Sequence, residues 1–167
     1  DGQFFAEYFD NLDLSGTPHA TQCETDLPSW HWHSISHEGD AVPGVPPILV
    51  GTIRNLAPEL FSARWTARLN MDQSDEYVFS SRANKGSRII VDGATILDSW
   101  EDCCSTFSSE PLRLSAGVHV VMYEYRSGYT AEYAPVDSYA ELSWSAAQGG
   151  TVGAGLGSNS ANAASTT

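Results

Sequence analysis

The sequence predicts an all-β domain, an antiparallel sandwich or barrel with long loops. Apolar and polar residues alternate with a period of two in several stretches, as in strands with one buried and one solvated face. Turn-rich segments separate these stretches, which is typical of sandwiches and barrels. No stretch shows the 3.6-residue period of an amphipathic helix.

The strand pattern is clearest in residues 61–69, FSARWTARL, where every second residue is apolar. The same alternation predicts strands within residues 3–9, 76–81, 88–92, 118–125 and 139–144. Residues 26–58 are rich in proline and lack it, so we expect a long loop there. Residues 146–167 are rich in Gly, Ala, Ser and Thr, so we expect a linker or tail after a domain spanning residues 1–145.

The charge balance limits the partners. Of 167 residues, 8 are Lys or Arg and 21 are Asp or Glu, a formal net charge of −13. Such a surface repels phosphate backbones, so we expect no nucleic-acid partner. No run of about 18 apolar residues is present, so we expect no membrane span in this chain.

The three cysteines are Cys23, Cys103 and Cys104. We predict a disulfide between Cys23 and one of the two later cysteines, because adjacent cysteines seldom bond to each other. Together with the acidity and the low Lys content, this favours an extracellular or cell-surface location.

Five segments together resemble the PA14 domain family: residues 4–16, 61–69, 76–100, 114–125 and 139–144. The more specific matches are Ala-Glu-Tyr-Phe, Val-Asp-Gly-x-x-x-Leu-Asp-x-Trp and Ala-Gly-x-His. The resemblance implies a β-sandwich module of the kind found in adhesins, toxins and glycosidases. Many members bind carbohydrate, and the lectin members hold calcium between two adjacent aspartates with the help of a loop asparagine.

This sequence departs from that calcium site. Asn84 and Lys85 stand at the positions of the two aspartates. A lysine is only a hydrogen-bond donor and cannot ligate calcium, although its ammonium could take the place of the ion. The usual loop asparagine is missing from residues 126–138, where Asp137 is a weak substitute. We therefore expect no metal and no cofactor, with calcium kept as the less favoured alternative.

The expected function is that of a non-catalytic extracellular interaction module, for adhesion or assembly within a larger surface or secreted protein. Two alternatives remain open: a carbohydrate-binding lectin domain, and an accessory domain of a glycoside hydrolase. The expected partners are glycans or neighbouring protein domains and chains. The candidate ligand-binding residues are Asn84, Lys85, Arg88, Trp100, Tyr129, Tyr133 and Asp137.

Two other clusters have simpler interpretations. His31 and His33 have a spacing that metal sites use, but a surface loop explains them better. Asp98, Glu101 and Asp102 are more typical of a solvated turn than of a calcium site. No nucleophile motif such as Gly-x-Ser-x-Gly is present, so we expect no enzyme activity.

Overall fold

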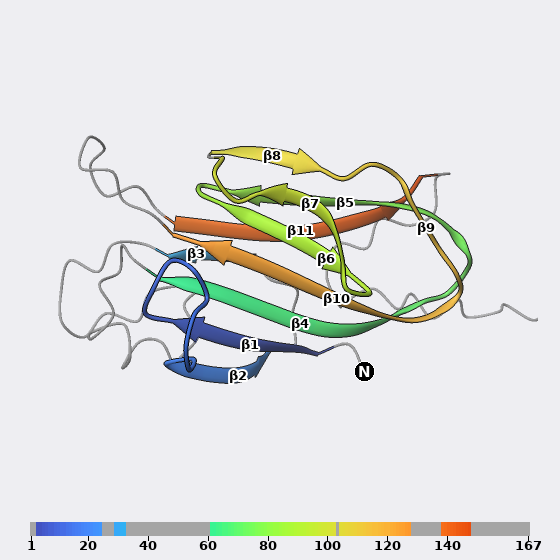
Figure 1. The fold of residues 1–167 in the computed structure, drawn as a ribbon. Coiled ribbons are helices and arrows are strands. Elements are labelled where there is room, and N and C mark those ends of the chain that lie inside the picture. Colours follow the sequence, from blue (N-terminus) through green and yellow to red (C-terminus); the bar gives the residue numbers. More distant parts are fainter. Residues whose placement is uncertain (1–2, 25–28, 33–60, 103, 128–137, 148–167) are drawn as a thin grey trace, which may run out of the picture.

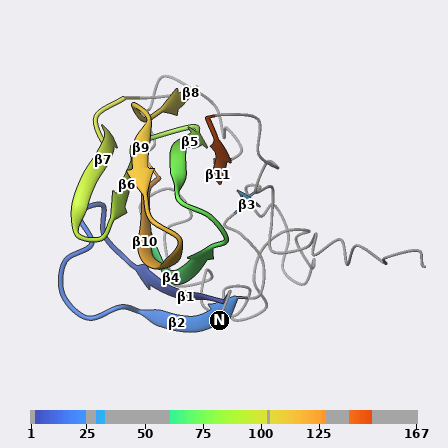
Figure 2. The ribbon, with the colours of Figure 1, turned by 90° about the vertical axis from the view of Figure 1, so that its right-hand side faces the viewer.

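A computed structural model describes residues 3–24, 29–32, 61–102, 104–127 and 138–147, which form two antiparallel sheets (Figure 1). The six-stranded sheet has the order β2 (Ala20–Glu24), β1 (Phe4–Phe9), β4 (Ser62–Met71), β10 (Gly117–Arg126), β6 (Ser87–Val91), β7 (Ala94–Ser99). The second sheet has the order β3 (Ser29–Trp32), β11 (Ser138–Ala146), β5 (Asp75–Ala83), β8 (Ser105–Ser108), and β9 (Leu112–Leu114) also pairs with β5. Figure 2 shows the six-stranded sheet curving from β7 round to β2. In the described part of the chain, no helix is long and apolar enough to cross a membrane.

The predicted all-β sandwich is confirmed, and the alternating pattern explains its core. In β4 the apolar residues face inward, and Trp65 is fully buried. The ring of Trp65 stacks on Tyr123 of β10, with centroids 5.6 Å apart, and meets Tyr8 of β1 edge-on at 5.9 Å. On β10 the opposite face carries exposed Val118 and Val120. Side-chain alternation therefore builds one aromatic core between the two sheets.

The strands that sequence analysis did not predict are short and lie at or near the sheet margins. They are β2, β3, β7, β8 and β9. β3 lies within the segment predicted as a long loop and pairs with β11. The residues of β8 are exposed or half-exposed, so no apolar alternation marks them. Edge strands bury little surface and consequently leave a weak signal in the sequence.

A buried carboxylate joins the edge strand β2 to the core. Glu24 accepts hydrogen bonds from the hydroxyl of Tyr8 at 2.5 Å, from Trp65 Nε1 at 3.0 Å and from Gln22 Nε2 at 2.8 Å. Burial, followed by the nearby Glu24 charge, raises the pKa of Tyr8 well above its usual range, so this phenol stays protonated and donates.

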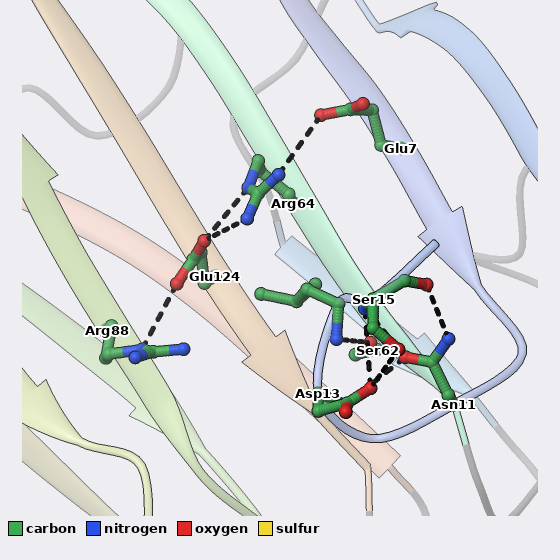
Figure 3. Close-up of polar contacts among 9 residues, drawn as sticks. Glu7, Asn11, Asp13, Ser15, Ser62, Arg64, Arg88 and Glu124 are labelled. Carbon is green, nitrogen blue, oxygen red and sulfur yellow. Dashed lines mark hydrogen bonds and ion pairs between the residues drawn. The ribbon is translucent and has the colours of Figure 1, made fainter. Parts of the chain in front are cut away.

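The turn between β1 and β2 is held by its own polar side chains (Figure 3). Asn11 Oδ1 accepts hydrogen bonds from the backbone N–H groups of Asp13 and Ser15, both at 3.2 Å. Leu14 has a φ of 59°, and its N–H donates to Ser62 Oγ on β4 at 3.2 Å. The Asn11 bonds hold the shape of the turn, and the Leu14–Ser62 bond attaches it to β4.

The predicted disulfide involving Cys23 is wrong, because Cys23 is a free and exposed thiol. Cys23 lies on β2 and Cys104 follows β7, at opposite margins of the six-stranded sheet. Five strand spacings of about 4.8 Å separate those margins, far more than a disulfide can bridge. Cys104 is disulfide-bonded, and Cys103 lies outside the described residues.

His119 of the Ala-Gly-x-His motif fastens β10 to the turn between β6 and β7. His119 Nδ1 lies 2.6 Å from Asp92 Oδ2, and His119 Nε2 lies 3.0 Å from the carbonyl oxygen of Ser115. Both partners are acceptors, so both contacts are hydrogen bonds only in the protonated imidazolium form of His119. The Asp92 hydrogen bond raises the pKa of His119, and the same bond lowers the pKa of Asp92.

This geometry predicts a pH-dependent stability. The raised pKa of His119 means that its contribution is complete below about pH 6.5 and is lost as the pH rises through the pKa of the folded state. The lowered pKa of Asp92 means that its contribution is lost only in acid, as the pH falls through the pKa of the folded carboxyl. We expect urea unfolding between pH 5 and pH 9 to give a free energy of unfolding that falls as the pH rises. In His119→Gln this free energy should fall less over the same range. Equal slopes in both proteins would contradict the assignment.

Candidate functional site

The tip of the β5–β6 hairpin, residues 84–86, lies where the resemblance expects metal ligands. Asn84 is buried, with 5% of its surface exposed. Its Oδ1 accepts hydrogen bonds from the hydroxyl of Tyr125 at 2.8 Å and from the backbone N–H of Tyr139 at 3.1 Å. The backbone N–H of Asn84 donates to the carbonyl oxygen of Tyr139 at 3.2 Å. The one side-chain oxygen that the sequence offered to an ion is therefore engaged inside the fold, where it joins β5 to β10 and β11.

Lys85, the next residue, is partly exposed. Its ammonium has no hydrogen-bond or ion-pair partner among the described residues. All peptide bonds of the described chain are trans, including the Asn84–Lys85 bond. The tip thus presents an unpaired cation and no free carboxylate of its own.

Two guanidinium groups gather on one indole beside this tip. Arg88 Cζ lies 4.1 Å from the ring centroid of Trp100, and Arg126 Cζ lies 5.4 Å from it. Arg126 Nη2 also pairs with Glu101 Oε2 at 2.7 Å. Arg88, Trp100, Glu101 and Arg126 are called the Trp100 cluster below. Cation–aromatic contacts of this kind fix the orientation of both arginines.

Gly86 allows the hairpin tip and the Trp100 cluster to meet. A Cβ at this position would lie 1.9 Å from the carbonyl oxygen of Trp100 and 2.9 Å from Arg126 Nε. The carbonyl oxygen of Gly86 accepts a hydrogen bond from the backbone N–H of Arg126 at 2.9 Å. Only a residue without a side chain permits this approach.

A row of alternating charges crosses the solvent face of the six-stranded sheet and ends at Arg88 (Figure 3). Register places Glu7 opposite Arg64, Arg64 opposite Glu124, and Glu124 opposite Arg88. Arg64 Nε and Nη2 both donate to Glu124 Oε1, at 2.9 and 2.7 Å. Arg88 Nε lies 3.1 Å from Glu124 Oε2, an ion pair that lacks the alignment of a hydrogen bond. Glu124 is buried, so this ion pair lies on the inner side of the Arg88 guanidinium, away from solvent.

Beneath the tip, buried hydroxyls connect the two sheets. Ser81 Oγ on β5 lies 2.8 Å from both Ser87 Oγ on β6 and the hydroxyl of Tyr123 on β10. Ser87 Oγ lies 3.0 Å from Ser99 Oγ at the end of β7. A satisfied network of this kind makes the floor of the site rigid.

The structure thus brings together some of the predicted site residues. Lys85, Arg88 and Trp100 lie around the β5–β6 tip, and Asn84 forms the support beneath them. Cys104 Sγ lies 3.2 Å from the carbonyl oxygen of Asn84. Four other predicted residues lie outside the described residues, namely Cys103, Tyr129, Tyr133 and Asp137.

The sequence pattern did not predict Glu124, Arg126 or the role of Glu101 as parts of the site. The signal was available in part, because Glu124 and Arg126 interrupt the apolar strand VHVVMYEYR on its solvent face. The sequence pattern does not give the register between β10 and β6, and this register places Glu124 beside Arg88. Glu101 was interpreted as a solvated turn residue, and its side chain is indeed 82% exposed.

The chemistry of the site is that of hydrogen-bond donors. The nearby carboxylates are already engaged: Asp98 Oδ1 accepts a hydrogen bond from the backbone N–H of Trp100 at 3.1 Å, and Glu101 is paired with Arg126. Among the described residues, no three His, Cys, Asp or Glu side chains are grouped so that they could hold a metal ion. Ammonium and guanidinium groups suit a ligand that presents oxygen acceptors.

The fold and this site define a two-sheet antiparallel β-sandwich whose β5–β6 hairpin carries the partly exposed Lys85 at its tip. The PA14 domain family matches residues 1–156, so the chain belongs to the PA14 domain family. It is 31% identical over 64 residues to the anti-sigma-I factor RsgI3 of Acetivibrio thermocellus, a match that covers 38% of this chain and 10% of that protein.

Two solved structures have similar folds. An anti-sigma factor domain-containing protein from Clostridium clariflavum gives a TM-score of 0.61 at 22% identity, covering 86% of this chain and 42% of that one. A PA14 sugar-binding domain from an RTX adhesin gives a TM-score of 0.53 at 18% identity, covering 90% of this chain and 93% of that one. The chain therefore spans about a tenth of RsgI3 and less than half of the Clostridium protein.

Proposed function

We propose that this PA14 domain is a non-catalytic, extracellular binding module that recognises a glycan through the β5–β6 tip and the Trp100 cluster, without calcium. The observation that carries the proposal is the set of donors at the tip. Lys85 has no partner among the described residues, and Arg88 is held on the partly exposed Trp100. Sugars present hydroxyl oxygens that accept hydrogen bonds from such groups.

The arrangement of the site supports binding rather than catalysis. The donors stand on strand ends and a tight hairpin, above a buried hydroxyl network, so little order has to be gained on binding. The similarity to the sugar-binding domain of the RTX adhesin supports a glycan as the ligand and a cell-surface or secreted parent protein. Adhesion or assembly within a larger protein is the role that such a module would serve.

The absence of a calcium requirement is supported by the tip itself. The side-chain oxygen of Asn84 is engaged by Tyr125 and Tyr139, and Lys85 offers no acceptor. An ion at this place would lack both of the oxygens that the lectin pattern supplies.

A glycan array followed by calorimetric titration of the strongest binder tests this function. We expect the same affinity in EDTA and in calcium, and a loss of at least tenfold in Trp100→Ala, because that variant removes the support of Arg88. Phe5→Ala is the matched control, since Phe5 is an exposed aromatic, 45% accessible, on β1. Binding that disappears in EDTA would contradict the metal-free site, and an array without any hit would favour a purely protein-binding module.

A further inference from the structure

We propose that Arg88 is the residue that selects the ligand, and that it selects a neutral sugar with two neighbouring hydroxyl groups, held by two parallel hydrogen bonds from its terminal nitrogens. This inference rests on the proposed glycan-binding function and deepens it. It assigns the recognition to one side chain and the ligand to one chemical class.

Arg88 is already fixed in place before any ligand arrives. Its Nε lies 3.1 Å from Glu124 Oε2, and its guanidinium plane carbon lies 4.1 Å from the centre of the Trp100 ring. Glu124 is itself buried and held by two bonds from Arg64. An arginine held by an ion pair beside Nε and by the contact of its face with an indole has lost rotamer freedom already, so a ligand has less of it to order.

The terminal nitrogens of Arg88 remain available. No residue that the structure describes accepts a hydrogen bond from them, and the side chain is 30% exposed. A guanidinium that contacts an aromatic ring with its face still presents its N–H groups in its own plane, as a fork with fixed spacing. Two oxygen atoms side by side, from a carboxylate or from neighbouring hydroxyls, match that fork.

The surrounding charge decides between these two kinds of ligand. The four charges of the row, those of Glu7, Arg64, Glu124 and Arg88, sum to zero. The charge of Arg126 is balanced by Glu101. Asp98 and Asp102 are exposed close by and add negative charge. Among the described residues, Lys85 is the one unpaired cation of the tip. In a chain with a net charge of −13, this site offers no net positive field for an anion. A neutral pair of hydroxyls is therefore favoured over a carboxylate.

Calorimetry in EDTA tests the proposal on the whole chain, with lactose, cellobiose and methyl α-mannoside as neutral probes and galacturonate as the acidic probe. We expect at least one neutral probe to bind more tightly than galacturonate. Arg88→Lys keeps the positive charge beside Glu124 but loses the fork, so it should weaken that binding at least tenfold while the melting temperature stays near that of the parent chain.

A deoxy form of the bound sugar separates recognition from a structural effect. Removing one of the two hydroxyls should weaken binding to the parent chain, and the same removal should cost little in Arg88→Lys, because the contact is already absent. Three results would overturn the role of Arg88 while leaving glycan binding intact. The deoxy sugar could lose as much affinity for Arg88→Lys as for the parent chain, Arg88→Lys could bind the intact sugar as tightly as the parent chain does, or galacturonate could bind more tightly than every neutral probe. If no probe and no arrayed glycan bound the parent chain, the proposed function itself would fail, and this inference with it.

Discussion

Asn84→Ala is expected to lower the free energy of unfolding by about 2–4 kcal/mol, because it removes the acceptor for two donors. The hydroxyl of Tyr125 and the N–H of Tyr139 both donate to Asn84 Oδ1, and Tyr125 is fully buried. A buried donor that loses its partner costs about 1–3 kcal/mol. Urea unfolding at pH 7 measures the loss, and ligand binding should fall as well, because the floor of the site loosens.

Lys85→Ala is the matched control for this prediction. The two residues are neighbours, but Lys85 has no partner among the described residues, so its removal should change stability by no more than about 0.5 kcal/mol. If Asn84→Ala were as harmless as Lys85→Ala, the inward role of the Asn84 amide would be wrong, and its oxygen would again be available to an ion.

Gly86→Ala is expected to have the second large effect, about 3 kcal/mol or more of destabilisation together with loss of binding. The new methyl group would lie 1.9 Å from a backbone oxygen, that of Trp100, which is too close for any real contact. The tip and the Trp100 cluster would have to separate, with the strain typical of overpacking. Thermal unfolding and the calorimetric titration described above measure the two effects.

Gly93→Ala separates a steric effect from a general effect of removing glycine. Gly93 has a φ of 82° and nothing within 4 Å of its potential Cβ, so alanine there should cost only the strain of a left-handed backbone, about 1–2 kcal/mol. A Gly86→Ala variant that is no less stable than Gly93→Ala, and that still binds, would contradict the close approach at the tip.

The long strands could be predicted from the sequence because each buries a full face. β4 shows this best, since its apolar residues alternate without interruption and all face the core. β8 could not be predicted because its residues are exposed or half-exposed and mostly polar. The predicted Cys23 pairing failed for a related reason, since cysteine spacing says nothing about which sheet margin each residue occupies.

The candidate site could be located from the sequence but not assembled from it. The family resemblance placed Asn84 and Lys85 at the positions of the metal ligands, and the donor-only ammonium of Lys85 excluded it as a calcium ligand. Whether Asn84 faces inward or outward depends on Tyr125 and Tyr139, which are more than 40 residues away. The position of Arg88 likewise depends on the β10–β6 register and on Trp100.

An amide and indole NMR titration of the chain in EDTA, with the neutral sugar that binds best, tests most directly whether the tip binds without calcium. The account predicts that the largest shifts fall on Lys85, Arg88 and the indole N–H of Trp100, and that added calcium leaves the spectrum of the complex unchanged. Shifts that appear only after calcium is added, or that gather around Phe5 on β1, would contradict it.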